Sequence, residues 1–196
     1  MYGIPTLEAL CRAARAQDQD MLALTDMNGL YGIIRFLDVA REARLKPIIG
    51  AELVHQTHRA VLLAKTPEGY ANLCRILSAR HCEESFDSIG TVARYRTGLV
   101  ILSDDRAALT AWSRDSAEDL YIELTPGPAM QQAVAFSREQ RLPPVATARA
   151  SFLRPADYQA HRLLRAIAEH TTLSRLRTDQ CAAPSHWLMP EPILDR

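Results

Sequence analysis

The sequence predicts an α/β fold in which parallel strands alternate with helices. Short apolar runs of strand length alternate with segments whose apolar residues recur at helical spacing along most of the 196 residues. Two of these runs, within 22–32 and 46–52, contain a carboxylate at their end, Asp26 and Glu52. Such alternation implies right-handed crossovers and either an open doubly wound sheet or a barrel, and periodicity does not distinguish between the two.

The first half of the chain opens with a helix that precedes any strand. Pro5 and Thr6 are typical of a helix start, and the helical period then continues to the polar stretch 17–19. The apolar run 21–25 follows as a strand, and a second helix begins at Gly32. The next expected elements are the strands 46–53 and 60–64 and a helix after Pro67, whose apolar face is Tyr70, Leu73, Cys74 and Leu77.

The second half continues the alternation and then becomes irregular. We expect strands at 99–102, 120–124 and 143–148, and helices at 107–112 and 129–140. A long final helix begins near Pro155, where Arg165 and Glu169 are spaced to form an ion pair. Its predicted buried face is Ala160, Leu163, Leu164, Ile167 and Ala168. We therefore divide the chain into a domain, 1–173, and an irregular proline-containing tail, 174–196, that docks elsewhere.

The composition is that of an ordinary soluble domain. Apolar residues make up 47% of the chain, and 23 Lys and Arg balance 23 Asp and Glu, so the total charge does not predict non-specific DNA binding. The four cysteines form no C-x-x-C pair, which favours reduced thiols over a disulfide framework. No apolar run is long enough for a membrane helix, and no secretory leader is visible. We expect a cytoplasmic protein that does not bind a membrane.

Carboxylates at strand ends, together with histidines, are the groups that a hydrolytic metal site needs. Asp26, Glu52 and His81 are the best candidates, because parallel strands bring their carboxyl ends to one edge. Two alternatives stay open. Asp26 precedes Asn28 and Gly29, and such an aspartate also serves as a turn or helix cap. His81 lies on the apolar stripe of its helix and is equally a histidine at the edge of the core. The other histidines, His55, His58, His161, His170 and His186, have no informative spacing.

Covalent catalysis has no support in the sequence. The chain contains no G-x-S-x-G elbow, no glycine loop that would cradle a phosphate and no Cys-His signature. It also lacks the spaced aspartates that a two-metal nucleotidyl transferase carries on its palm domain. The chemistry of a polymerase therefore cannot reside in this chain.

Several longer stretches carry a family resemblance. They are M-Y-G-I-P-T-L-E-A-L, A-L-T-D-M-N-G-L-Y-G, K-P-I-I-G-A-E, G-Y-A-N-L-C-R-I-L-S-A-R-H, L-V-I-L-S-D-D, P-P-V-A-T and residues 152–173. Together they resemble the polymerase and histidinol phosphatase (PHP) domain of the bacterial C-family DNA polymerase III alpha subunit, in texture closest to the error-prone branch. The resemblance implies a distorted (βα)7 barrel of TIM-like type, here without its first strand and degenerate at its metal site.

The departures from the family pattern concern its metal ligands. The family's Thr-Asp-His is Thr25-Asp26-Met27, and its terminal Asn-Asp-x-His ends here in Arg149, Ala150 and Ser151. The resemblance therefore leaves Asp26, Glu52, His81 and Asp105 as vestigial metal-site positions, and Met27, Arg149 and Ser151 as substituted ones. We expect no catalytic residue and no metal. We further hypothesise that the Arg149 guanidinium replaces the charge of the metal and pairs with Asp26 or Glu52.

The implied function is a non-catalytic PHP segment that supports polymerase architecture in DNA replication and repair. Its expected partner is the remainder of a C-family polymerase or its replication and repair assembly, with only indirect contact to DNA. The alternative is a metal-dependent phosphoesterase or 3'-5' exonuclease that holds Zn, Mn or Fe on a reduced ligand set. A third hypothesis is a chain without a stable independent role, because a missing strand leaves sheet edges unpaired.

Overall fold

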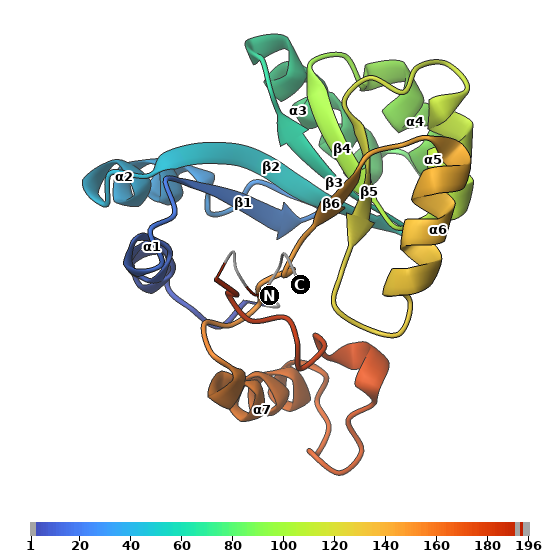
Figure 1. Ribbon diagram of the computed structural model, residues 1–196. Coiled ribbons are helices and arrows are strands. Elements are labelled where there is room, and N and C mark those ends of the chain that lie inside the picture. Colours follow the sequence, from blue (N-terminus) through green and yellow to red (C-terminus); the bar gives the residue numbers. More distant parts are fainter. Residues whose placement is uncertain (1–2, 191–192, 194–196) are drawn as a thin grey trace.

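The computed structural model of the chain describes residues 3–190 and 193, and it is a mixed α/β structure (Figure 1). The strands are β1 Met21–Met27, β2 Lys46–His55, β3 His58–Ala64, β4 Leu99–Ser103, β5 Leu120–Leu124 and β6 Pro144–Ala146. The helices are α1 Leu7–Ala16, α2 Ile33–Glu42, α3 Pro67–Cys82, α4 Ser88–Tyr95, α5 Arg106–Ser113, α6 Met130–Gln140 and α7 Tyr158–Ala168, with 3-10 turns η1 Pro155–Asp157 and η2 Thr178–Gln180.

The strands form one sheet in the order β1-β2-β3-β4-β5-β6, curled into half a barrel (Figure 1). The expected alternation of strands and helices is largely confirmed, but the purely parallel sheet is wrong, because β3 runs antiparallel to both β2 and β4. The cause is a hairpin. His55 pairs with His58, so only Gln56 and Thr57 connect the two strands, and Gln56 adopts the left-handed conformation typical of such tight turns.

The sheet has two different faces. Alternate strand residues pack with α3, α4, α5 and α6 into the main core, whose centre includes Leu62, Leu73, Ile101, Leu109 and Leu120, all without exposed surface. A second apolar cluster joins α1 and α2 to the same side of β1 and β2. We call this side the helix face and the opposite side, which carries none of these six helices, the inner face.

Helix α4 was absent from the sequence-based expectation. Its eight residues are too few to give a clear helical period, but Asp87 provides the start signal. The Asp87 side chain accepts hydrogen bonds from the backbone nitrogens of Ile89 and Gly90, each at 3.1 Å. The strand expected at 143–148 is also shorter than predicted, because only Pro144–Ala146 pairs with β5.

The face of helix α7 that we predicted to be buried is exposed to solvent. Leu163, Leu164 and Ile167 are 50%, 50% and 63% exposed, whereas His161, Arg165 and Ala166 are buried. The reason is that the opposite side of the helix packs on Phe152 and on the tail. The His161 ring lies 5.7 Å from the Phe152 ring, and its Nε2 accepts a hydrogen bond from the backbone of Ala182. The predicted ion pair between Arg165 and Glu169 is confirmed.

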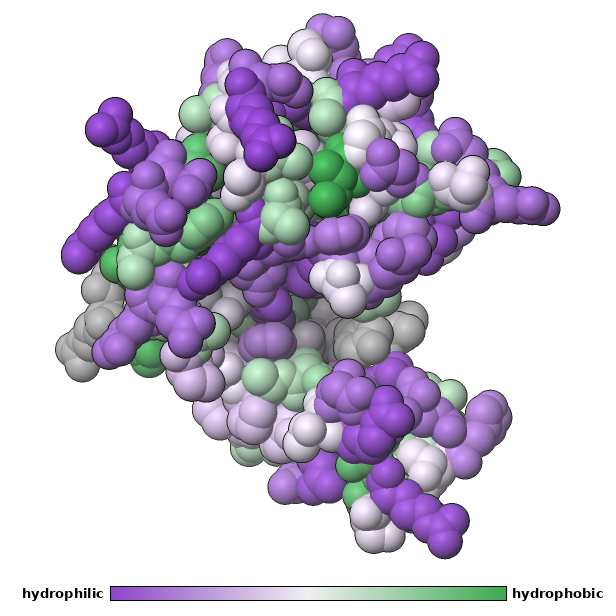
Figure 2. All heavy atoms as spheres, turned by 90° about the vertical axis from the view of Figure 1, so that its right-hand side faces the viewer, coloured by the Kyte–Doolittle hydropathy of each residue, from purple (hydrophilic) through white to green (hydrophobic). Residues whose placement is uncertain are grey.

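Part of the tail is tied to the rest of the chain. The backbone of Ser151 donates to the carbonyl of His186, and the backbone of Leu188 donates to that of Phe152. The Gln17 side chain reaches the Leu188 carbonyl at 3.0 Å. Figure 2 shows the surface hollowed between the body of the molecule and this C-terminal part. Residues 191–192 and 194–196 of the predicted tail lie outside the described residues, and the division at residue 173 stays a prediction.

None of the helices in the described part of the chain is long and apolar enough to cross a membrane.

Helix α3 approaches the turn before β4 closely enough to require a glycine. A Cβ added to Gly69 would lie 1.8 Å from the carbonyl oxygen of Gly98, which is backbone and cannot rotate away. We therefore expect Gly69→Ala to lower the free energy of unfolding by roughly 1–3 kcal/mol, although alanine is the better helix former by about 1 kcal/mol. Urea unfolding followed by circular dichroism measures this change.

The matched control is Ser78→Ala, an exposed position in the same helix. It should change the free energy of unfolding by no more than about 0.5 kcal/mol. Equal stability of Gly69→Ala and the unmodified protein would show that α3 does not depend on this close approach.

Candidate functional site: an arginine-carboxylate cluster at the sheet edge

Charged side chains gather where β2, β4, β5 and β6 end and where β3 begins. The carboxyl ends of parallel strands are the edge at which α/β folds place their sites, and the antiparallel hairpin brings the start of β3 to the same edge. The side chains interact on the inner face of the sheet. We call this group the arginine-carboxylate cluster; its members are Glu52, Arg59, Asp104, Glu123 and Arg149.

Glu123 is the centre of the cluster. Its side chain is only 1% exposed, and it is the fourth residue of the otherwise apolar strand Leu-Tyr-Ile-Glu-Leu. Its Oε2 accepts from Arg59 and from Arg149, whose Nη2 lies at 2.8 Å and Nε at 3.2 Å. The Thr147 hydroxyl donates to Oε1 at 2.5 Å. Both oxygens of this buried carboxylate are therefore satisfied, as a buried charge requires.

Arg59 links Glu123 to Glu52 because of strand register. Arg59 pairs with Val54, and Glu52 is two residues before Val54, so both side chains lie on the inner face as a diagonal cross-strand pair. The guanidinium Nε contacts Glu52 and Nη1 contacts Glu123, with Asp104 at 3.9 Å from Nη1. One arginine thus bridges carboxylates that come from β2, β5 and the end of β4.

The protonation equilibria follow from this arrangement. Burial alone would raise the pKa of Glu123, but the positive charges of Arg59 and Arg149 outweigh it and lower that pKa below its ordinary value. Burial would lower the pKa of Arg59, whereas the carboxylates of Glu123 and Glu52 raise it above its usual value. Both groups are therefore charged at neutral pH.

Arg149 belongs to the cluster, but its partners differ from those we hypothesised. Its Nη2 lies 2.5 Å from Asp104 and 2.8 Å from Glu123, and the structure gives it no contact with Asp26 or Glu52. The predicted pairing was therefore wrong, because Glu52 is already engaged by Arg59. The Arg149 backbone has a positive φ of 45°, which is uncommon for a residue with a Cβ.

Asp26 and Glu52 lie at the same end of neighbouring parallel strands, as expected, but not on the same face. Register pairs Glu52 with Met27 and Asp26 with Ala51, so Asp26 lies on the helix face. There its Oδ2 accepts from the backbone nitrogen of Gly32 at 2.8 Å, directly before α2. This contact agrees with the alternative that Asp26 serves as a turn or cap residue.

The remaining candidate positions are also separate from the cluster. His81 is exposed, and its Nε2 lies 2.6 Å from the backbone oxygen of Asn28. Met27, the substituted histidine position, is 37% exposed beside Glu52. Ser151 donates to the carbonyl of Arg149 at 3.4 Å, and its backbone is bonded to the tail.

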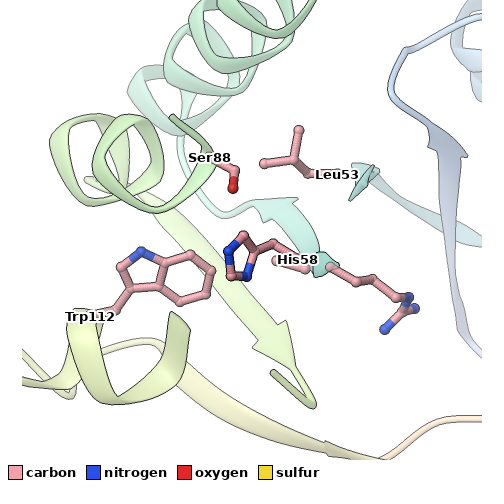
Figure 3. Close-up of a pocket in the computed structure, with 6 residues that line it drawn as sticks. Leu53, His58, Ser88 and Trp112 are labelled. Carbon is pink, nitrogen blue, oxygen red and sulfur yellow. The ribbon is translucent and has the colours of Figure 1, made fainter. Parts of the chain in front are cut away.

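Asp105 lies on the opposite face from its neighbour Asp104. It caps α5 through hydrogen bonds from Ala107 and Ala108, and its other oxygen lies 2.5 Å from His58 Nδ1. Figure 3 shows the His58 ring between Trp112 and Ser88, close to Leu53. The cavity that these side chains line is only about 10 Å³, which is the space for one water molecule and excludes a substrate.

The side chains do not fit the metal that the family resemblance implies. Among residues 3–190 and 193, no three His, Cys, Asp or Glu side chains come close enough to hold an ion. Glu52 and Glu123 are bonded to arginines, Asp26 to a helix start, and Asp105 to His58. Two positive side chains occupy the edge where hard oxygen ligands would have to converge on a cation.

Sequence reasoning missed most members of the cluster. The sequence did contain a signal for Glu123: it is a lone carboxylate inside an apolar strand, and such a carboxylate needs a positive partner when it is buried. The sequence contained no such signal for Arg59 and Asp104, since their positions in the cluster depend on the β2-β3 hairpin and on the register of β4. His58 was set aside for its uninformative spacing, and only the structure places it beside Asp105.

Comparison with known proteins identifies the family. The PHP domain family model matches residues 1–135. The chain belongs to the PHP domain family. It is 24% identical to the DNA polymerase III subunit alpha of Vibrio cholerae over 96% of this chain, and 48% identical over 71 residues, 33% of this chain, to the error-prone DNA polymerase of Anaeromyxobacter dehalogenans. It spans only 19% and 6% of the lengths of those two proteins.

Two solved structures share the fold of this PHP domain. A protein assigned as a metal-dependent phosphoesterase from Bifidobacterium adolescentis superposes with a TM-score of 0.51 at 11% identity, over 74% of this chain and 82% of that one. An amidohydrolase from Chromobacterium violaceum superposes with a TM-score of 0.50 at 13% identity, over 73% and 81%. At these identities the likeness concerns the fold alone.

His186 makes the stability of this PHP domain dependent on pH. Partial burial and the charges of Arg149 and Arg59 lower the pKa of His186 from 6.5 to about 4. Between these values the unfolded chain binds more protons than the folded one, so stability falls as the pH drops from 6.5 toward 4. We expect His186→Gln to lose less stability than the unmodified protein between pH 7 and pH 5, measured by urea unfolding at each pH. His170→Gln, at an exposed histidine, is the control and should keep the unmodified pH dependence.

Proposed function

We propose that the chain acts as a non-catalytic PHP segment of a bacterial DNA polymerase III alpha subunit of the error-prone type. In this role it supports the architecture of the polymerase in DNA replication and repair and performs no chemistry itself. The observation that carries the proposal is the arginine-carboxylate cluster. The carboxylates at the edge of the sheet are held by Arg59 and Arg149, where a metal-dependent enzyme needs open oxygen ligands.

The relatives support the polymerase context. The likeness to the Vibrio cholerae alpha subunit extends over nearly the whole of this chain but only a fifth of that subunit. We infer that the partner is the remainder of a C-family polymerase or its replication and repair assembly, in the cytoplasm, and that any contact with DNA is indirect. The distorted (βα)7 barrel of TIM-like type is part of the same proposal.

The exposed side of α7 supports a role inside a larger assembly. It presents Leu163, Leu164 and Ile167 to solvent, while the charged Arg165 points inward. A contiguous apolar surface on a helix usually marks a contact with another protein surface. We infer that this side of α7 packs on the rest of the polymerase.

We further propose that Asp26, Glu52, His81 and Asp105 are vestigial metal-site positions and that Met27, Arg149 and Ser151 replace former ligands. Elemental analysis of protein purified without chelator tests this assignment. We expect less than stoichiometric Zn, Mn and Fe, and no hydrolysis of phosphoesters or of DNA 3' ends above the level of an Asp26→Ala, Glu52→Ala variant. Stoichiometric metal that this variant loses would instead support the phosphoesterase or exonuclease.

Substitution of the α7 surface tests the polymerase context. Leu164→Glu together with Ile167→Glu should leave the melting temperature within about 3 °C, because both side chains are at least half exposed. The binding partner in this test is a C-family polymerase from the same genome, chosen because that polymerase has no PHP domain of its own. The same variant should reduce co-purification with this polymerase at least tenfold, which corresponds to about 1.4 kcal/mol of binding free energy.

Ile34→Glu, at an exposed position on α2, is the matched control and should co-purify like the unmodified chain. Undiminished co-purification of the α7 variant would remove α7 from the interface. Failure of the unmodified chain to co-purify would contradict the proposed polymerase partner itself.

A further inference from the structure

The arginine-carboxylate cluster connects five segments of the chain that are far apart in sequence. Glu52 comes from β2, Arg59 from β3, Asp104 from the end of β4, Glu123 from β5, and Arg149 follows β6. Every contact within the cluster joins a guanidinium to a carboxylate, and both guanidinium groups meet at one oxygen, Glu123 Oε2. The cluster therefore closes one edge of the curled sheet through two positive centres.

We infer that Arg59 and Arg149 serve as an internal substitute for a divalent cation and hold this edge together without metal. This inference rests on the proposed loss of the metal site and deepens it, because it concerns how the edge of the sheet is stabilised once the metal is gone. This explains why the side chains at the edge of the sheet do not fit a metal ion. The positive charge is still present at the edge, but it belongs to two covalently attached side chains.

The charges show why such a substitute is needed. The cluster contains the three carboxylates of Glu52, Asp104 and Glu123, and the two guanidinium groups leave it with a single excess negative charge. Glu123 is 1% exposed, so without a positive neighbour it would be a buried, uncompensated charge.

The geometry also allows a divalent cation to take the place of the Arg149 guanidinium group. Arg149 Nη2 lies 2.5 Å from one Asp104 oxygen and 2.8 Å from Glu123 Oε2, so a single donor group sits between two carboxylates. Carboxylate oxygens from two chain segments that converge on one point are the ligands that Ca²⁺ and Mn²⁺ use. Removal of the guanidinium alone would leave these oxygens facing the space that it occupied.

The test is rescue of an arginine variant by divalent cations. Arg149→Met keeps most of the aliphatic volume and removes the charge, and in EDTA we expect its melting temperature to fall by roughly 10 °C, as for a broken buried ion pair in a domain of this size. Addition of millimolar CaCl2 or MnCl2 should restore at least a third of that loss. The unmodified protein should respond to neither EDTA nor cation by more than about 1 °C.

Two controls separate charge from general effects. Arg154→Met removes an exposed arginine that pairs with Asp157, and it should change the melting temperature little and show no response to cations. Arg149→Met combined with Glu123→Gln removes the carboxylate that the cation would meet, and it should lose the rescue. Arg149→Lys keeps the positive charge but lacks the planar, bidentate donor group of arginine. Its melting temperature should therefore lie between those of the unmodified protein and Arg149→Met, and divalent cations should not raise it.

Three results would overturn the inference. They are an Arg149→Met protein that melts like the unmodified one, a destabilised Arg149→Met protein that no divalent cation stabilises, and an equal cation effect on the unmodified protein. If Arg149→Met does not fold, Arg149→Lys still decides, because a stabilisation of that variant by Ca²⁺ or Mn²⁺ would show that its charge does not fill the site.

Discussion

The buried carboxylate of Glu123 is the constraint on which the edge of this sheet depends. A charge that is 1% exposed is tolerated only with positive partners and filled hydrogen bonds, and Arg59, Arg149 and Thr147 provide them. These partners come from β3 and from the segment after β6, so the requirement of one side chain fixes the relative positions of distant strands. The positive charges of Arg149 and Arg59 that compensate Glu123 also lower the pKa of the nearby His186, and Arg149 itself adopts a left-handed backbone conformation.

The same interaction relates the fold to the function that we propose. A hydrolytic PHP enzyme needs carboxylates and imidazoles that are free to bind metal at the edge where the strands end. In this chain the carboxylates at that edge already have guanidinium or backbone partners, and Asp26 faces the helices. The ion pairs of this edge stabilise the ends of the strands, and exposed apolar side chains lie elsewhere, among them Leu163, Leu164 and Ile167 on the outward side of α7.

Much of the fold could be predicted because its elements have clear periods. The strands 21–25, 46–53 and 120–124 and the helices at α1, α3 and α6 are found close to where the apolar spacing places them. The antiparallel β3 was not predictable, since a two-residue turn of Gln56 and Thr57 carries no glycine or asparagine signal. The α7 prediction failed for another reason. Periodicity finds an apolar stripe but cannot say whether this chain or another protein covers it.

The hairpin between β2 and β3 also determines which charges meet at the sheet edge. In a strand, neighbouring side chains point to opposite faces, so His58 turns toward Asp105 on the helix side and Arg59 turns toward Glu52 and Glu123 on the inner side. Gain or loss of one residue in the two-residue connection would exchange these two positions. A change in loop length, with no change of any charged residue, would then place a titratable imidazole where a permanent cation now stands. The chemical character of this edge is therefore encoded as much in the length of one turn as in the identity of its side chains.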